Sequence, residues 1–161
     1  MKKLLEADEP VYLTQEGIEK LGHRLKQIEE YDLPQAIADV RITGEFGDFS
    51  ENAEYQEAKA RMRRLRDQAT GIRERLKSVI VIERGGADVT SVQLGSRVLL
   101  EMPDGKHKHF EIVGPQETDP LRGKLSYKSP LGAKLMNRTV GERVTVQGGS
   151  GELVHKILGI A

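Results

Sequence analysis

The 161-residue chain contains no cysteine, few aromatic residues and no excess of charge of either sign. Without cysteine, neither a disulfide framework nor a thiolate metal site can form. Aromatic residues make up only 4% of the chain, too few for a surface that stacks on the bases of single-stranded nucleic acid. Basic and acidic residues balance at 25 each, so bulk charge indicates neither a nucleic-acid nor a membrane partner, and any electrostatic role must come from local patterning.

Long apolar runs are also missing. No stretch approaches the roughly 20 apolar residues that a membrane-spanning helix needs. The N-terminus, Met-Lys-Lys-Leu-Leu-Glu-Ala-Asp, turns acidic after two leucines and lacks the apolar core of a signal peptide. The histidines have no zinc spacing, and neither a nucleophile triad nor a phosphate-binding glycine loop is evident. We therefore expect a soluble, cytoplasmic protein with no membrane partner and no small-molecule substrate.

The first half of the chain, residues 14–82, has helical periodicity. Its first apolar run is Ile18, Leu21, Leu25 and Ile28, and it resumes with Ile37 and Val40. Pro34 interrupts this run, because proline and the residue before it disfavour the interior of a helix. We predict a kink or short break near Tyr31–Leu33.

A second apolar run advances in alternating steps of four and three: Ala58, Met62, Leu65, Ala69, Ile72, Leu76 and Val79. This spacing is typical of a coiled-coil seam. Since neither helix has an apolar stripe wide enough for a large core, we predict that the two pack on each other as an antiparallel hairpin. Leu25 then lies near Ile72, and Leu21 near Leu76.

Beyond a glycine-containing linker at 84–90, the period changes to that of strands. The predicted strands are Arg97–Met102, His109–Val113, Arg143–Gln147 and Leu153–Ile157, with one short helix near Leu131–Asn137. Glycines in Pro103-Asp104-Gly105 and at 148, 149 and 151 predict turns. The fold class is therefore α+β, with a helical hairpin over 1–83 and a small β-rich domain over 91–161.

The bend of the hairpin, near 44–51, lies in an acidic segment. Its carboxylates are Glu45, Asp48, Glu51, Glu54 and Glu57. Asp48 and Glu51, three residues apart, could be the N-cap of the second helix and its capping-box partner. They could instead present oxygen ligands to Mg²⁺, which takes one or two carboxylates and keeps several waters. In that case Ser50 is a candidate for the cap. The spacing alone leaves both interpretations open.

Two further groups of residues flank this acidic pair. Phe46 and Phe49, two of the three phenylalanines in the chain, could close the end of the coiled coil or insert into a partner. Lys59, Arg63 and Arg66 recur at a spacing of four and three, so they share one face of the second helix. That face, here called the basic ridge, could be a solvated surface or a contact for a polyanion.

Two motifs of this chain resemble those of the bacterial Gre transcript cleavage factors, GreA and GreB, with GreA the nearer. One is Gly47-Asp48-Phe49-Ser50-Glu51-Asn52-Ala53-Glu54-Tyr55. The other is Ser129-Pro130-Leu131-Gly132-Ala133-Lys134-Leu135-Met136, followed by Val140-Gly141-Glu142-Arg143-Val144. The resemblance covers nearly the whole chain in the same order. It implies an N-terminal antiparallel coiled coil followed by an FKBP-like C-terminal domain that binds RNA polymerase.

The resemblance also implies a function. A Gre factor binds bacterial RNA polymerase beside its secondary channel and stimulates the polymerase's own cleavage of backtracked nascent RNA, so it is not itself an enzyme. By the same resemblance, Asp48 and Glu51 assist the polymerase active site by helping to hold a second Mg²⁺, and no tightly bound metal is expected in the free protein. The basic ridge then faces the RNA 3′ end.

The chain departs from the family pattern at two places. Phe49 stands where leucine is usual, and the link Ile42–Phe46 is longer than in the family. A longer link could alter the reach of the acidic segment. Two alternatives therefore stay open: an inhibitor of the same fold that occupies the channel, and a coiled-coil adaptor unrelated to transcription in which the acids are caps.

Overall fold

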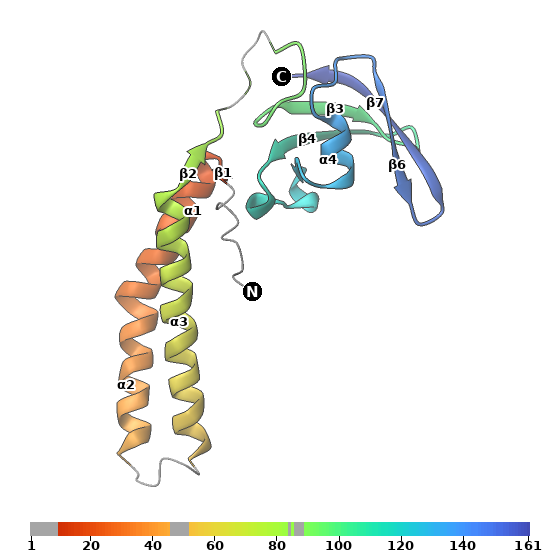
Figure 1. Cartoon of the computed structure of the whole chain (residues 1–161). Coiled ribbons are helices and arrows are strands. Elements are labelled where there is room, and N and C mark those ends of the chain that lie inside the picture. The colour runs from red at the N-terminus through yellow and green to blue at the C-terminus, as the bar shows by residue number, and fades with distance from the viewer. Residues whose placement is uncertain (1–9, 46–51, 84, 86–88) are drawn as a thin grey trace, which may run out of the picture. The chain divides into compact units, whose positions relative to one another are not determined.

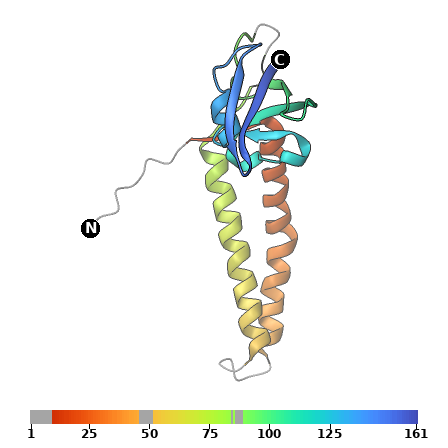
Figure 2. The same cartoon turned by 90° about the vertical axis from the view of Figure 1, so that its right-hand side faces the viewer.

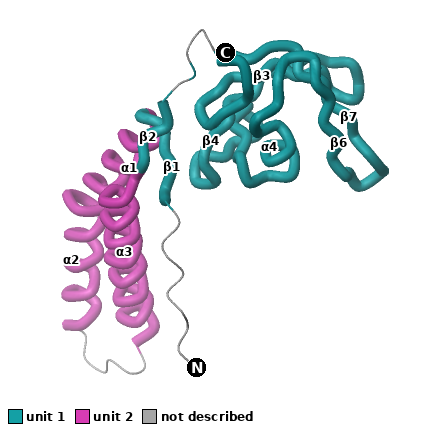
Figure 3. The backbone as a smooth tube through the Cα atoms, turned by 45° about the horizontal axis from the view of Figure 1, so that its top comes forward, with its two compact units in different colours: residues 1–15, 80–161 teal, residues 16–79 magenta. Residues whose placement is uncertain are grey.

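The computed structural model describes residues 10–45, 52–83, 85 and 89–161 (Figure 1). The chain forms two compact units (Figure 3). One unit comprises residues 16–79, and the other comprises residues 1–15 together with 80–161. Phe46, Asp48, Phe49, Ser50 and Glu51 lie outside the described residues.

The first unit is a helical hairpin. Its first arm consists of α1 (Gln15–Gln27), the π-helical turn η1 (Ile28–Asp32) and α2 (Leu33–Gly44), and its second arm is α3 (Ala53–Lys77). Figures 1 and 2 both show α2 and α3 side by side. The predicted hairpin is thus confirmed.

A narrow apolar seam holds the two arms together, as the alternating spacing predicts. Ile28, Ala69 and Ile72 are buried in it, and they are flanked by half-buried leucines: Leu21, Leu25, Leu33, Leu65 and Leu76. Leu25 and Ile72 lie in the same cluster, as do Leu21 and Leu76. The seam needs few aromatic side chains, because small and aliphatic residues fill the space between two closely packed helices.

The first arm is not broken at Pro34. The irregularity expected near Tyr31–Leu33 takes the form of the π-helical turn η1, which precedes α2, and Pro34 lies in the first turn of α2. Ala36 is fully buried, whereas Ile37 is 45% exposed. The prediction that the apolar pattern resumes at Ile37 is therefore wrong, because the π turn changes which residues face α3.

The helical prediction also extends too far at the end of the second arm. α3 ends at Lys77, and Val79–Val81 form the strand β2, which pairs with the strand β1 (Val11–Leu13). The N–H of Ile82 donates to the carbonyl of Leu13 at 2.7 Å. β-Branched residues lose little on entering a strand, so a partner strand more than sixty residues away along the chain decides the conformation here.

The C-terminal unit contains a curled mixed sheet with strand order β5-β4-β3-β7-β6 (Figure 1). Its strands are β3 (Arg97–Glu101), β4 (His107–Val113), β5 (Lys124–Ser126), β6 (Arg143–Gly148) and β7 (Gly151–Ile160). β4 and β5 are parallel, and the other neighbours are antiparallel. Two short 3-10 turns, η2 (Pro115–Glu117) and η3 (Pro120–Arg122), join β4 to β5.

The core of this unit is formed by apolar side chains that the strands and their flanking segments direct to one face of the sheet. Its buried members are Val92, Val98, Leu100, Ile112, Leu135, Val144 and Ile157. All four predicted strands are present, with β4 beginning two residues earlier and β7 longer at both ends. The short strand β5 was not predicted. The predicted turns occur as well: Gly148 pairs with Gly151 across a two-residue connection, and Gly105 has φ of 77°.

The helix α4 (Pro130–Leu135) explains the residue choice in the second motif. Ser129 is its N-cap and accepts a hydrogen bond from the Gly132 N–H at 3.1 Å, while its hydroxyl donates to the Ser126 carbonyl at 2.7 Å. Pro130 occupies the first helical position, where a missing N–H costs nothing. A Cβ on Gly132 would lie 1.9 Å from the Ser126 carbonyl oxygen, so glycine permits the close contact between α4 and β5.

Candidate functional site

The acidic motif lies in the connection between the two arms of the hairpin. α2 ends at Gly44 and α3 begins at Ala53, and the segment between them carries Asp48 and Glu51. These two acids, like Phe46 and Phe49, lie outside the described residues. The roles that the sequence suggests for them stay predictions, and the site is built from the two helix ends that carry the connection.

Asn52 caps the second arm. Its backbone is extended, with φ of −81° and ψ of 96°, and its side chain accepts a hydrogen bond from the Tyr55 N–H at 3.0 Å. The suggestion that Asp48 is the N-cap with Glu51 as its capping-box partner is therefore wrong, and so is the alternative of Ser50. Asn52, and not either of the tip acids Asp48 and Glu51, therefore supplies the N-cap of α3.

The flanking acids differ in how far they are neutralised. Glu45, at the end of α2, lies 3.6 Å from Arg41, and Glu57 lies 2.6 Å from Arg64. Glu54 is exposed in the first turn of α3, where the partial positive charge of the helix N-terminus favours a carboxylate. Negative charge therefore accumulates on both sides of the connection and is offset only by surface ion pairs.

The basic stretch behind the bend separates into two sets. Arg61 and Arg64 make ion pairs, at 3.0 Å to Asp39 and 2.6 Å to Glu57. By contrast, Arg63 and Arg66 are exposed and have no ion pair or hydrogen bond with any other described residue. Lys59 is half-buried, and its ammonium lies 5.1 Å from the centre of the Tyr55 ring. The basic ridge consists of the residues that surface ion pairs leave available.

Polar contacts between the two arms help to hold α3, and with it the basic ridge, in position. Besides Arg61 and Asp39, Arg73 pairs with Glu29, and Arg24 donates to Gln68 at 3.2 Å. Each of these exposed contacts adds at most about 1 kcal/mol. Because they are spread along both arms, they help to keep α3 in one rotational position on the first arm.

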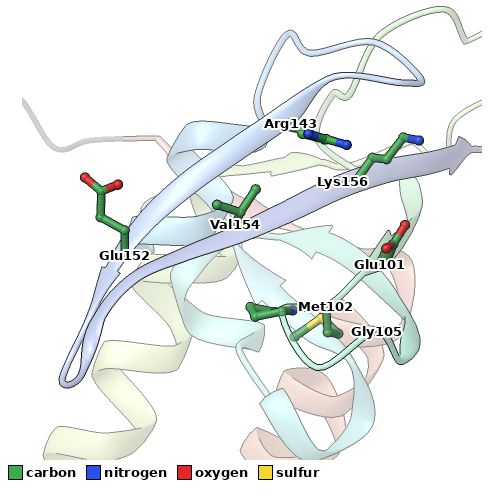
Figure 4. Close-up of a pocket in the computed structure, with 8 residues that line it drawn as sticks. Glu101, Met102, Gly105, Arg143, Glu152, Val154 and Lys156 are labelled. Atoms are coloured by element: carbon green, nitrogen blue, oxygen red, sulfur yellow. The ribbon is translucent and has the colours of Figure 1, made fainter.

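A hollow on the C-terminal sheet presents charges of both signs (Figure 4). Lys156 of β7 has Glu101 of β3 as its partner on one side and Arg143 of β6 on the other. Val154 and Met102 line the same hollow. One carboxylate and two neighbouring cations beside apolar atoms suit a protein surface better than a small anion or a metal ion.

Three groups with shifted pKa values lie in the C-terminal unit. The Lys106 backbone N–H lowers the pKa of Asp104, and the Thr139 backbone N–H lowers that of Glu142. Burial lowers the pKa of His155, whose Nδ1 has no hydrogen-bond partner among the described residues. Asp104 and Glu142 hold turns, while His155 lies inside the sheet. All three belong to the C-terminal unit and not to the hairpin, so these shifts do not mark the candidate site.

Two classes of site are not seen in the described part of the chain. There, no group of three or more His, Asp or Glu side chains is arranged to hold a metal ion. No described helix combines the length and apolar character required to cross a bilayer. Asp48 and Glu51 alone supply too few oxygen ligands to fill the octahedral coordination shell of Mg²⁺.

Asn52 is the residue of the bend that the sequence analysis missed. The signal was present: asparagine is among the most favoured N-caps, and Glu54 follows in the first turn. The clustered carboxylates nearby competed for the same assignment, because aspartate is an equally good cap. Only the position at which α3 begins separates these candidates.

Comparison with known proteins agrees with both halves of the fold. Residues 11–81 match the family profile described as transcription elongation factor, N-terminal. Residues 87–161 match the profile described as transcription elongation factor, GreA/GreB, C-term. The chain is 35% identical over 156 residues to the transcription elongation factor GreA of Bacillus cytotoxicus, covering 96% of this chain and 99% of that protein. It is 37% identical over 158 residues to GreA of Bacillus velezensis, with the same coverage.

Among solved structures, the chain is similar to GreA factor homolog 1 (Gfh1) of Thermus thermophilus. The identity is 26%, the TM-score is 0.43, and the match covers 95% of this chain and 99% of that one.

Proposed function

The chain belongs to the GreA/GreB family of transcription elongation factors, and we propose that it binds bacterial RNA polymerase at the secondary channel and stimulates cleavage of backtracked nascent RNA. The observation that carries the proposal is the bend of the hairpin. The family motif connects two long helices, and Asn52 supplies the helix cap. Since Asn52 is the N-cap, we assign the carboxylates of Asp48 and Glu51 to the polymerase active site.

In this proposal the chain contributes ligands and electrostatics, and the polymerase performs the reaction. Asp48 and Glu51 supply carboxylate oxygens toward an Mg²⁺ shared with the polymerase. When bound, such a metal activates a water for in-line attack on a phosphodiester. Because two carboxylates leave most of the Mg²⁺ shell to be filled, the remaining ligands in this proposal come from the polymerase and water. Phe46 and Phe49 flank the acids and either close the hairpin or contact the polymerase.

The basic ridge gives the same arm a second role. Arg63 and Arg66 are exposed and unpaired among the described residues, and Lys59 lies one helical turn closer to the bend. A displaced RNA 3′ segment that passes along α3 presents phosphates to these cations. Such contacts are charge-driven and weaken as salt concentration rises. The acids and the ridge then have separable duties, one toward the metal and one toward the RNA.

The C-terminal unit is proposed to provide most of the polymerase affinity. The hollow around Lys156, with Glu101 and Arg143 beside it, has the mixed charge of a protein-binding surface (Figure 4). Complementary charge on a partner accelerates encounter and fixes orientation. This division of labour leaves the hairpin free to enter the channel.

A cleavage assay on stalled, backtracked transcription complexes tests the proposal. Addition of the full-length protein is expected to shorten the RNA from its 3′ end and to restore elongation. Suppressed RNA synthesis without cleavage would instead identify an inhibitor that occupies the same channel. If RNA length and synthesis rate both stay unchanged although the protein is folded, a coiled-coil adaptor becomes the better interpretation.

A further inference from the structure

Asn52 uses both ends of its side-chain amide. Its Oδ1 accepts the hydrogen bond from the Tyr55 N–H at 3.0 Å, which caps α3. Its Nδ2 donates to the backbone carbonyl of Thr43 at 3.1 Å, which lies in the last turn of α2. One half-buried side chain thus joins the end of the first arm to the beginning of the second.

The contact satisfies groups at both helix ends. The last carbonyls of a helix and its first N–H groups have no partner within the helix. In α2, the Glu45 N–H turns back to the Ile42 carbonyl at 3.2 Å, and Asn52 takes the next carbonyl, that of Thr43. The Thr43 hydroxyl in turn donates to the Asp39 carbonyl at 2.8 Å. The Thr43 carbonyl, the acceptor of the Asn52 bond, thus lies in the last turn of α2.

Capping alone does not require asparagine. Aspartate and serine cap a helix about as well, but neither carries the amide N–H₂ that reaches the Thr43 carbonyl. The contact of Asn52 lies two to three helical turns nearer the bend along α3 than the ion pair of Arg61 with Asp39 at 3.0 Å.

We propose that Asn52 is the positioning residue of the hairpin bend. By tying the Thr43 carbonyl to the start of α3, it holds the two anchor points of the connection that carries Asp48 and Glu51 at one separation. This inference rests on the proposed function. Asn52 acts through the connection and does not itself touch the reacting atoms. Without the Asn52–Thr43 hydrogen bond, the arms stay packed along their seam, but the distance between the two ends of the connection is no longer fixed.

Two variants separate the hydrogen bond from Asn52 to the Thr43 carbonyl, here called the tie, from the helix cap. Asn52→Asp keeps the capping oxygen and replaces the amide donor with a carboxylate oxygen, which the Thr43 carbonyl repels. Asn52→Ser keeps a capping oxygen without adding charge. A result shared by both variants therefore reports loss of the donor and not a change of charge. Thr43→Val is the matched control, because it removes a hydroxyl from the same turn but leaves the carbonyl that Asn52 binds.

The first measurement is cleavage of backtracked RNA as a function of factor concentration. In both Asn52 variants we expect the maximal cleavage rate to fall by roughly ten- to a hundred-fold, since small misplacements of a group at a reacting centre have effects of that size. The concentration for half-maximal effect and the helical circular dichroism should stay unchanged, and Thr43→Val should behave like the wild type. A wild-type maximal rate, a shift in the half-maximal concentration alone, or loss of helicity would each overturn the positioning role.

The second measurement needs no polymerase. Because the chain lacks cysteine, nitroxide labels can be placed at Ile42→Cys and Glu54→Cys, two exposed positions on either side of the tie. The distribution of distances between the labels should broaden in both Asn52 variants and not in Thr43→Val. An unchanged distribution overturns the inference. If the wild-type protein fails to stimulate cleavage while the distribution still broadens, the proposed function is wrong and the tie stands.

Discussion

The backbone N–H of Leu33 donates to the carbonyl of Ile28, five residues earlier, where an α-helix would use a partner four residues earlier. This bond adds one residue to the turn and shifts the inward face of the first arm by one position. An uninterrupted pattern of four and three from Ile28 would place Asp32 and Asp39 on the apolar seam. With the extra residue, the inward positions are Leu33, Ala36 and Val40.

The two displaced acids take part in ion pairs instead. Asp32 lies 2.8 Å from Arg24, and Asp39 lies 3.0 Å from Arg61. The π turn also precedes Pro34, which cannot donate a backbone hydrogen bond and disturbs a regular helix. One local irregularity therefore accommodates the proline, keeps carboxylates out of the seam and aligns the apolar residues of α2 with α3.

The shift of the inward face predicts unequal effects of two isoleucine substitutions. Ile28 is fully buried, whereas Ile37 is 45% exposed. Ile28→Ala should lower the free energy of unfolding by about 2–5 kcal/mol, as expected for a large core residue. Ile37→Ala should lower it by less than about 1 kcal/mol. Urea unfolding of both variants, followed by circular dichroism, compares them directly, and equal losses would contradict the assigned face.

The tip acids should affect cleavage and leave stability unchanged. Asp48→Asn and Glu51→Gln should each sharply reduce stimulated cleavage while binding to polymerase stays nearly intact. Because Asn52 provides the cap, neither variant should lose the roughly 1 kcal/mol that removal of a helix cap costs. Cleavage, polymerase binding and melting temperature are measured together. Wild-type cleavage in both variants would remove the metal-directed role.

The basic ridge should matter most for long backtracks. Replacing Lys59, Arg63 and Arg66 with serine should reduce cleavage mainly of RNAs whose displaced 3′ segment reaches α3, and the wild-type advantage should shrink as salt rises. The matched control removes three arginines that surface ion pairs already occupy: Arg61, Arg64 and Arg73. Cleavage is compared across backtrack lengths. Equal loss at every length, or the same loss in the control, would show that the ridge is only a solvated face.

Burial of His155 predicts a pH-dependent stability of the C-terminal unit. Desolvation lowers the pKa of His155 below its ordinary value of 6.5, so the unfolded chain takes up a proton before the folded one does. Stability should be constant above pH 6.5 and should fall below it, by at most about 1.4 kcal/mol per pH unit, until the folded pKa is passed. Hydrogen exchange of the β6 and β7 amides measures this slope. His155→Leu should remove it, and an unchanged slope in that variant would assign the effect to another group.

The C-terminal domain should compete for polymerase by itself. Residues 91–161 contain the whole five-stranded sheet and α4, and this fragment should displace the full-length factor from polymerase without stimulating cleavage. A competition assay with labelled full-length protein measures this, and the circular dichroism spectrum of the fragment first establishes that it is folded. A folded fragment that does not compete would place the main polymerase contact elsewhere.

The order and type of the main elements follow from residue patterns alone. Alternating steps of four and three around Ala69 and Ile72 specify a paired helix, because only side chains at that spacing share one stripe. Strand periodicity and the glycine turns locate β3, β4, β6 and β7 in the same way. The two motifs identify the family. In the second motif, Ser129 caps α4 and Gly132 allows α4 to lie close to the Ser126 carbonyl, so the residue types follow from one local structure.

Tertiary structure decided what depends on residues distant in the chain. Val79 fits a helix seam or a strand equally well by its own preference, and the partner strand β1 selects the strand. Among basic residues of similar spacing, the contact with Asp39 on the other arm separates Arg61 from the basic ridge. Asp48, Ser50 and Asn52 are all good caps, and the packing of the two arms settles where α3 begins. Local propensities differ by only about 1 kcal/mol or less per residue, so they leave more than one conformation open, and contacts between distant residues select among them.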